Sequence, residues 1–192
     1  MTSSRNIAVY GGSFNPLHIG HLAIMKHLVD VAGFDAVYLV VSPKNPLKQS
    51  ISSDSARDRY NAAVEAVGRH FGDKADQVRV DDIELNMPSP HYTIRTLEAL
   101  KEREPENRFT LVMGADNLSI IRNWKDYSKI LTDYGIAVFP REGYDMAQIK
   151  QDLLSEDPAY KIHLLDAPLV TISSTEIREA RQRGEDISKY LM

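Results

Sequence analysis

Residues 7–21 read IAVYGGSFNPLHIGH, and this stretch indicates a strand, a glycine turn and the start of a helix. Residues 7–10 are apolar and lead into Gly11 and Gly12, which let the backbone turn tightly and approach a ligand closely. From His18 to Val31 apolar residues recur every three or four positions, as on one face of a helix. Unpaired N–H groups at a helix start attract anions. The stretch therefore predicts a strand–loop–helix unit that binds an anion such as phosphate.

Two histidines open the predicted helix. His18 and His21 are three positions apart, so they share one face of its first turn. Imidazoles placed there can donate hydrogen bonds to phosphate oxygens. A pair of capping or surface histidines is the alternative interpretation. The complete string from Gly11 to His21, in this order between a strand and a helix, favours the phosphate site.

The rest of the chain alternates strands and helices. Further strands are predicted over residues 36–41, 78–85, 109–113, 136–139 and 161–165. Helices are predicted over 92–103, 124–131, 146–154 and 174–183, and an apolar helical stripe runs from Ala56 to Phe71. This alternation predicts an α/β fold: a doubly wound, mostly parallel sheet with helices on both faces and right-handed crossovers. One domain over residues 1–192 is expected, with ligands bound beyond the carboxyl ends of the strands.

Composition excludes several kinds of chemistry. The 192 residues contain no cysteine, so cysteine nucleophiles and thiolate zinc sites are impossible. Lys and Arg number 23 against 27 Asp and Glu, a net charge of −4 that disfavours a nucleic-acid partner. No apolar run reaches about 18 residues, so no membrane span is expected. With no signal-peptide pattern at its start, the chain is predicted to be cytoplasmic. The sequence leaves its oligomeric state open.

A second motif lies near the other end, where residues 172–178 read ISSTEIR. Ser173 and Glu176 fit a capping box, which predicts a helix start. Arg178 follows one turn inside that helix, beside hydroxyl and N–H groups. A guanidinium fork next to a helix N-terminus suits a polyphosphate. A capping box alone is common, so this motif by itself leaves a purely structural role open.

Both motifs resemble known signatures. Residues 11–21 resemble the (T/H)xGH-type signature of the nucleotidyltransferase superfamily, and residues 172–178 resemble its ISSTxIR element. Between them, SPKNPLK (42–48) resembles a Pro-rich loop ending in Lys, and YTIRTL (92–97) resembles SYTxxTL. MGADNL (113–118), followed by Trp124, resembles GxDxL…W, and REGY (141–144) resembles RPGY. In this order the motifs resemble those of bacterial nicotinate-mononucleotide adenylyltransferases over nearly the whole chain.

Three positions depart from that pattern. His91 stands where the family usually has Ser, Leu47 where a His commonly precedes the loop Lys, and Glu142 where it has Pro. None of the three replaces a predicted phosphate-binding residue.

The resemblance implies a Rossmann-like fold and a reaction. ATP and nicotinate mononucleotide would give nicotinate adenine dinucleotide and pyrophosphate. Mg²⁺ would be held mainly by the ATP phosphates and water, with no protein ligand set of its own. ATP and the mononucleotide are the implied partners, with neither a nucleic acid nor a membrane.

The resemblance also assigns residues. The catalytic set comprises His18, His21, Lys48 and Arg178. The ATP-binding set comprises Gly11, Gly12, Ser13, Phe14, His18, His21, Gly114, Asp116, Ile172, Ser173, Ser174, Thr175 and Arg178. The pyridine-nucleotide set comprises Asn15, Lys48, Tyr92, Thr93, Trp124 and Arg141.

Other readings stay open. The acceptor could instead be nicotinamide mononucleotide or another small phosphate, as in the phosphopantetheine and cytidylyl transferases of the same superfamily. Class I tRNA synthetases share the HIGH-type string, but length and charge disfavour them. The chain could also be a non-catalytic nucleotide-binding domain. Asp81, Asp82 and Glu84 could bind a metal, although a solvated strand end is the favoured interpretation.

Overall fold

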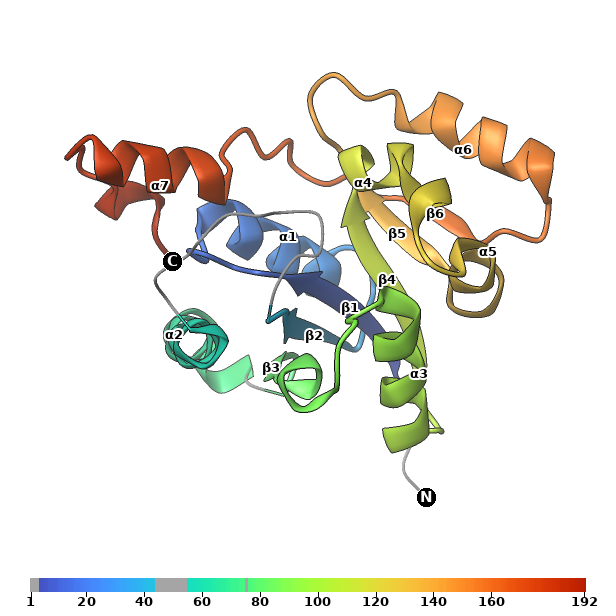
Figure 1. Ribbon diagram of the computed structural model, residues 1–192, viewed down its shortest axis with the longest axis horizontal. Coiled ribbons are helices and arrows are strands. Elements are labelled where there is room, and N and C mark those ends of the chain that lie inside the picture. The colour runs from blue at the N-terminus through green and yellow to red at the C-terminus, as the bar shows by residue number, and fades with distance from the viewer. Residues whose placement is uncertain (1–3, 44–54, 75) are drawn as a thin grey trace.

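A single parallel sheet organises the computed structural model, which describes residues 4–43, 55–74 and 76–192 (Figure 1). In these residues the sheet has six strands in the order β3-β2-β1-β4-β5-β6, and every neighbouring pair is parallel. The strands are β1 (Asn6–Gly12), β2 (Ala36–Val41), β3 (Val78–Asp81), β4 (Arg108–Gly114), β5 (Ile136–Phe139) and β6 (Ile162–Leu164). The predicted doubly wound α/β fold is confirmed.

Helices cover both faces of the sheet. They are α1 (Ile19–Asp30), α2 (Ala56–Phe71), α3 (Thr93–Arg103), α4 (Ala115–Ser119), α5 (Tyr127–Lys129), α6 (Met146–Glu156) and α7 (Ser174–Gln182). Successive side chains of a strand point to opposite faces. Ile7 and Val9 accordingly belong to a core cluster shared with α3 and α6, whereas Ala8 and Tyr10 belong to one shared with α1 and α2. Because β1 is buried on both faces, it shows a continuous apolar run rather than alternation.

The strand order fixes where a ligand can bind. From β1 the chain winds outward to β2 and β3, and from β4 it winds the other way to β5 and β6. β1 and β4 lie side by side, so the crossovers diverge from this pair and leave a crevice at its carboxyl end. That end carries Gly12 and Gly114, which lie in two of the motifs found in the sequence.

Two predicted elements differ from the observed ones. The strand predicted over 78–85 ends at Asp81, and a 3-10 turn over Ile83–Asn86 follows. The helix predicted over 124–131 is a short α5 that continues into a π-helix over Ile130–Tyr134. It begins later because Asp126 adopts a left-handed φ of 52°, which stops a helix from starting at Trp124. The short α4 after β4 was not predicted.

The interpretation of Asp81, Asp82 and Glu84 as a solvated strand end is wrong for Asp81, the last residue of β3, and for Glu84. Asp81 is buried; its carboxylate accepts hydrogen bonds from the Arg103 guanidinium at 2.6 and 3.1 Å and from the Ile83 N–H at 3.0 Å. Glu84 is buried and accepts a hydrogen bond from the Thr96 hydroxyl at 2.7 Å. Asp82 pairs with Arg57 at the surface. Within the described ranges, no group of three or more His, Cys, Asp or Glu side chains could hold a metal ion.

In the described part of the chain, every helix is too short or too polar to cross a membrane.

Candidate active site

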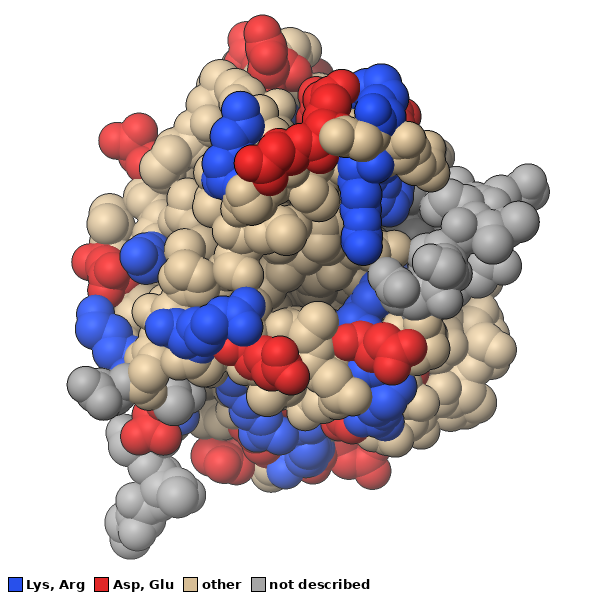
Figure 2. All heavy atoms as spheres, turned by 90° about the vertical axis from the view of Figure 1, so that its left-hand side faces the viewer, with Lys and Arg blue, Asp and Glu red and all other residues tan. Residues whose placement is uncertain are grey.

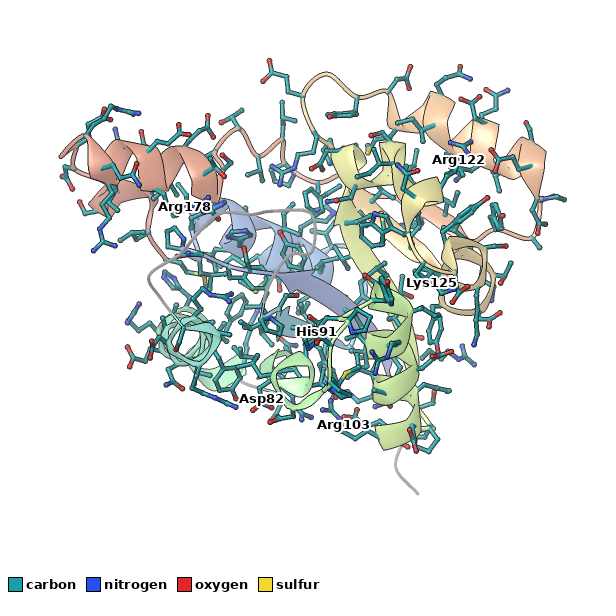
Figure 3. The ribbon with its side chains drawn as sticks, in the orientation of Figure 1. Asp82, His91, Arg103, Arg122, Lys125 and Arg178 are labelled. Carbon is teal, nitrogen blue, oxygen red and sulfur yellow. The ribbon has the colours of Figure 1, made fainter. Side chains whose placement is uncertain are left out.

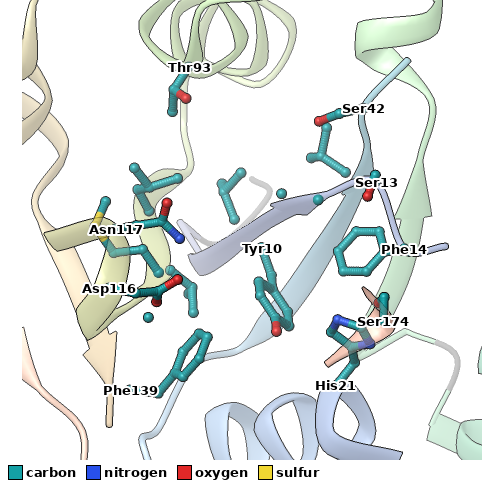
Figure 4. Close-up of a pocket in the computed structure, with 18 of the residues that line it drawn as sticks. Tyr10, Ser13, Phe14, His21, Ser42, Thr93, Asp116, Asn117, Phe139 and Ser174 are labelled. Atoms are coloured by element: carbon teal, nitrogen blue, oxygen red, sulfur yellow. The ribbon is translucent and has the colours of Figure 1, made fainter. Parts of the chain in front are cut away.

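A cavity of about 990 Å³ opens at the carboxyl edge of the sheet, where β1 and β4 end. It brings together segments that are far apart in the sequence, and Figure 4 shows residues of β1, α1, α3, α4, β5 and α7 around it. On the face drawn in Figure 2, charged side chains surround a hollow of mostly uncharged surface. The predicted site residues that line the cavity are Gly11, Gly12, Ser13, Phe14, Asn15, His18, His21, Tyr92, Thr93, Gly114, Asp116, Trp124, Arg141, Ser173, Ser174, Thr175 and Arg178.

Two predicted residues are not placed there. Ile172 is half-buried and is not part of the lining. Lys48, with the rest of its loop from residue 44, falls outside the described residues. The roles assigned to individual residues stay predictions, but the convergence of both end motifs on one cavity is a structural fact.

The two histidines cap α1 through their rings. His18 is the N-cap residue, and its Nδ1 accepts the Gly20 N–H at 3.1 Å. The Nδ1 of His21 accepts the His18 N–H at 3.1 Å, which completes a reciprocal cap. A ring nitrogen that accepts a hydrogen bond carries no proton, so both neutral rings hold their proton on Nε2. The capping and ligand-binding interpretations are therefore compatible, because Nε2–H remains available to a ligand.

Burial keeps both rings neutral. His18 is 2% exposed, and removal from water, together with the nearby Arg141 charge, lowers its pKa to about 4. The pKa of His21 lies well below its usual value because of burial, with His18 and then Arg141 adding to the shift. The ring centroids are only 3.7 Å apart, so two positive charges there would repel each other. The pair therefore offers neutral hydrogen-bond donors until an anion arrives.

The loop between β1 and α1 has an unusual backbone. Phe14 has a φ of 45°, in the left-handed region that non-glycine residues rarely adopt. Its ring is buried and packs edge-on against Tyr10 and His21, with centroids 5.6 and 5.1 Å away. A Cβ on Gly12 would lie 3.0 Å from the same ring. Packing of the Phe14 ring thus holds the turn in a shape that the backbone alone disfavours.

Helix α7 is tied to this loop. The Arg178 guanidinium donates to the Asn15 carbonyl at 2.6 Å and to the Thr175 hydroxyl at 3.0 Å. The Ser174 hydroxyl donates to the Pro16 carbonyl at 3.0 Å. The predicted capping box is present, with Ser173 and Glu176 reciprocally bonded. Arg178 projects from α7 toward the start of α1 in Figure 3, so the two motifs form one structural unit.

Two glycines allow close packing around the cavity. A Cβ on Gly20 would lie 2.4 Å from Val170 Cγ1, so α1 can approach the segment before α7 only because this side chain is missing. A Cβ on Gly114 would lie 2.3 Å from the Asp116 carboxylate and 3.0 Å from Arg141 Nε. Both positions show why glycine stands in these motifs.

Asp116 and Arg141 face each other after β4 and β5. Asp116 Oδ1 and Arg141 Nε are 3.6 Å apart, and neither atom has a hydrogen-bond partner in the described chain. Arg141 also donates to the Val170 carbonyl at 3.2 Å and lies over the Phe139 ring. Unsatisfied buried polar atoms indicate a site that is completed by a ligand or water. Arg141, predicted for the pyridine nucleotide, thus lies beside residues predicted for ATP.

The start of α3 forms another wall of the cavity. Tyr92 is the N-cap residue and makes no side-chain cap, so the first N–H groups of the helix, beginning at Thr93, have no side-chain partner from it. Trp124 lines the same cavity and packs against the core beside α3. His91, just before α3 in Figure 3, has its Nε2 3.0 Å from the Met87 carbonyl. This wall combines an aromatic surface with a helix N-terminus.

Sequence reasoning missed other lining residues, notably Arg59, Glu84, Asn117 and Lys125. Arg59 could have been found, because it shares a buried face of α2 with Ala63, and a charge on an apolar face is a signal. Glu84 was noticed only as one of an acidic group. Its inward direction depends on the 3-10 turn, which the sequence pattern did not reveal.

Comparisons with known proteins agree with this geometry. The family described as cytidylyltransferase-like matches residues 9–180. A protein of Flavobacterium johnsoniae named "Probable nicotinate-nucleotide adenylyltransferase" is 37% identical over 185 residues, covering 96% of this chain and 91% of that relative. A protein of the same name from Bacteroides fragilis is 37% identical, covering 95% and 85%.

A solved structure shares the fold. The nicotinic acid mononucleotide adenylyltransferase of Plasmodium falciparum, complexed with NaAD, superposes with a TM-score of 0.78 over 97% of this chain and 90% of its own, at 22% identity. The family model matches residues 9–180, and the sheet order agrees with it. The chain therefore belongs to the cytidylyltransferase-like nucleotidyltransferases. Within that class, identity above 30% over nearly complete chains places it in the nicotinate-nucleotide adenylyltransferase family.

Proposed function

We propose that this chain transfers the adenylyl group of ATP to nicotinate mononucleotide, forming nicotinate adenine dinucleotide and pyrophosphate. The observation that carries the proposal is the convergence of the residue 11–21 and 173–178 motifs on one cavity at the crevice between β1 and β4. A phosphate oxygen of the mononucleotide attacks the α-phosphorus of ATP. The bond between that phosphorus and the oxygen bridging to the β-phosphate breaks, and pyrophosphate leaves with the electron pair.

The acceptor phosphate is already ionised at neutral pH, so the reaction needs no general base. It needs alignment of the two phosphates and stabilisation of the charge that develops on the leaving group. The Nε2–H groups of His18 and His21 supply such donors, and their neutral rings place no fixed charge in the resting site. Arg178 and the N-terminus of α7 supply positive charge and N–H groups from the other side.

Recognition of the adenosine part falls to the end of β4. Asp116 Oδ1 lacks a hydrogen-bond donor in the described chain and would accept one from a ribose hydroxyl. The missing side chain of Gly114 lets the Asp116 carboxylate and the Arg141 guanidinium lie close against the backbone there. Tyr92, Thr93 and Trp124 would hold the pyridine ring and its substituent, with Asn15, Lys48 and Arg141 assigned to the rest of that nucleotide.

Mg²⁺ would enter with ATP. It prefers oxygen ligands and keeps several waters when it binds nucleotide phosphates. The carboxylates among the described lining residues are those of Glu84, Asp116 and Glu142, and Asp116 would be the one nearest the adenosine part of ATP in this proposal. The metal would neutralise phosphate charge during transfer.

The proposal includes one working domain over residues 1–192 and a cytoplasmic location. The lack of cysteine suits a reducing compartment. The net charge of −4 supports small nucleotides, rather than a nucleic acid, as partners.

Product analysis tests the function. The chain is incubated with ATP, Mg²⁺ and, separately, nicotinate mononucleotide, nicotinamide mononucleotide and phosphopantetheine, and products are separated by chromatography. We expect nicotinate adenine dinucleotide and pyrophosphate in equal amounts. ATP binding without any dinucleotide would instead identify a non-catalytic nucleotide-binding protein, and product only with phosphopantetheine would reassign the acceptor.

A further inference from the structure

A buried arginine on α2 joins two loops of the cavity. Arg59 is 7% exposed, and its Nη1 donates to the Ser13 and Ser42 carbonyls, the latter at 3.0 Å. Its Nη2 donates to the Pro43 carbonyl at 2.9 Å. Ser13 follows β1, whereas Ser42 and Pro43 follow β2, and all four residues line the cavity. One planar side chain from a helix therefore sets the relation between two loops that are distant in the sequence.

The contact with Ser13 controls a peptide plane. The carbonyl of Ser13 and the N–H of Phe14 belong to one rigid peptide and point in opposite directions. Holding that oxygen on Arg59 therefore fixes the direction of the Phe14 N–H. Phe14 needs such support because its φ of 45° is disfavoured. On its other side, the Asn15 carbonyl accepts a hydrogen bond from Arg178 at 2.6 Å, so guanidinium groups from α2 and α7 hold the carbonyls of the two residues next to Phe14.

The same contacts keep partial negative charge away from the cavity. Carbonyl oxygens carry partial negative charge and would repel a phosphate if they turned toward it. Arg59 binds three of them at the edge of a cavity proposed to hold a triphosphate. A lysine cannot replace this arrangement, because an ammonium is a compact charge without the planar fork of donors.

We infer that Arg59 is a positioning residue for the nucleotide triphosphate, acting through the loops after β1 and β2. The expected changes in kcat and KM rest on the proposed function, whereas a change in the Kd of ATP requires only that the chain binds ATP. It assigns to α2 a role in ATP use that neither end motif contains.

Three variants test it: Arg59→Lys, Arg59→Ala and the control Arg57→Met. Arg57 lies on the same helix but is half-exposed and pairs with Asp82. Calorimetry gives the Kd of ATP, and steady-state kinetics give kcat and the KM of each substrate. For Arg59→Ala, methylguanidinium is added to occupy the vacated space. Circular dichroism checks that each variant is folded.

We expect Arg59→Lys to lower kcat/KM for ATP by about tenfold to a hundredfold, the usual cost of misplacing a reacting group by about 1 Å. The KM for nicotinate mononucleotide should change less than about threefold, the control should match the wild type, and methylguanidinium should restore ATP use to Arg59→Ala. An unchanged kcat/KM for ATP in Arg59→Lys would overturn the inference. Equal increases in KM for ATP and for nicotinate mononucleotide would overturn it as well. A wild type that binds ATP but makes no dinucleotide would overturn the proposed function alone, and the ATP Kd would then decide the role of Arg59.

Discussion

A histidine whose Nδ1 already accepts a backbone hydrogen bond has one nitrogen left for a ligand. His18 and His21 are both in this state, and each supports the other's backbone or ring. Removing either ring therefore removes a helix cap together with a proposed phosphate donor. A variant that keeps the cap separates these two effects.

We predict that His18→Ala and His21→Ala lower kcat more than they weaken ATP binding. Loss of a preorganised donor typically costs on the order of 10²–10³ in rate. Asn can still accept a backbone N–H as a cap, so His18→Asn should recover stability without recovering the rate. Steady-state kinetics and thermal melts on the three variants provide the measurement. Turnover above about half the wild-type value in either alanine variant would contradict the catalytic assignment.

The lowered pKa of His18 predicts a loss of stability in acid. The unfolded chain binds a proton near pH 6.5, whereas the folded chain resists it until about pH 4. The unfolding free energy should therefore fall as the pH drops from 6.5 toward 4, by up to about 1.4 kcal/mol per pH unit for this group. Urea unfolding of wild type and His18→Asn at pH 7 and pH 5 tests this. The variant should lose less stability between the two pH values, and parallel losses would show that His18 does not titrate in this way.

At the scale of elements, the close approach of α1 to the segment before α7 depends on the absence of a side chain at Gly20. Gly20→Ala would drive a Cβ into Val170 Cγ1, with His18 ring atoms 3.0 Å away. We expect a loss of about 1–3 kcal/mol of stability, as for other overpacked sites, together with reduced activity. Adding Val170→Ala should restore part of the loss, because it removes the nearest atom. Gly68→Ala on α2 is the matched control: no atom lies within 4 Å of its new Cβ, so a gain of about 0.5–1 kcal/mol is expected. The free energy of unfolding is measured with denaturant for the wild type, Gly20→Ala, Gly20→Ala with Val170→Ala, and Gly68→Ala. Wild-type stability in Gly20→Ala would contradict the prediction.

The start of α3 predicts which pyridine nucleotide is used. Free N–H groups and the helix dipole favour the carboxylate of nicotinate, whereas an amide would present its own donors there. A charge-assisted hydrogen bond is worth about 1.5–3 kcal/mol, or roughly 10- to 150-fold. We therefore expect at least about tenfold higher kcat/KM for nicotinate than for nicotinamide mononucleotide in a competition assay. Equal use of the two would remove the acid-specific assignment and leave adenylyl transfer intact.

The same elements show what the sequence could predict. Residues 36–41 are apolar throughout, and they form β2 with the predicted bounds, because a strand buried on both faces leaves an unmistakable pattern. The strand at 78–81 was predicted too long, because the next apolar residues belong to a turn that the Asp81 carboxylate stabilises. The start of α5 depends on the backbone of Asp126, for which apolar spacing gives no information. Glycine and histidine motifs revealed the cavity, whereas Arg59 acts through carbonyls of other elements and has no local motif.

At the scale of the whole molecule, ATP should stabilise both end motifs at once. Because Arg178 and Ser174 bond to the loop that precedes α1, a ligand that orders one motif should order the other. We predict that saturating ATP slows amide hydrogen exchange in residues 11–21 and 173–178 together. The exposed helix α6 lies outside the cavity and serves as the internal control. Exchange measured by mass spectrometry should show this pattern. Protection confined to one motif would show that ATP does not order the two motifs together.

The placement of α7 against the first loop also has a consequence for biosynthesis. A ribosome produces β1 through β5, and with them most of the sheet, well before it produces Ser173 and Arg178. The emerging chain can therefore bury its core while the nucleotide crevice still lacks one wall. Competence to hold the triphosphate would therefore arise only when α7 (Ser174–Gln182) has left the ribosome and docked, later than burial of most of the sheet.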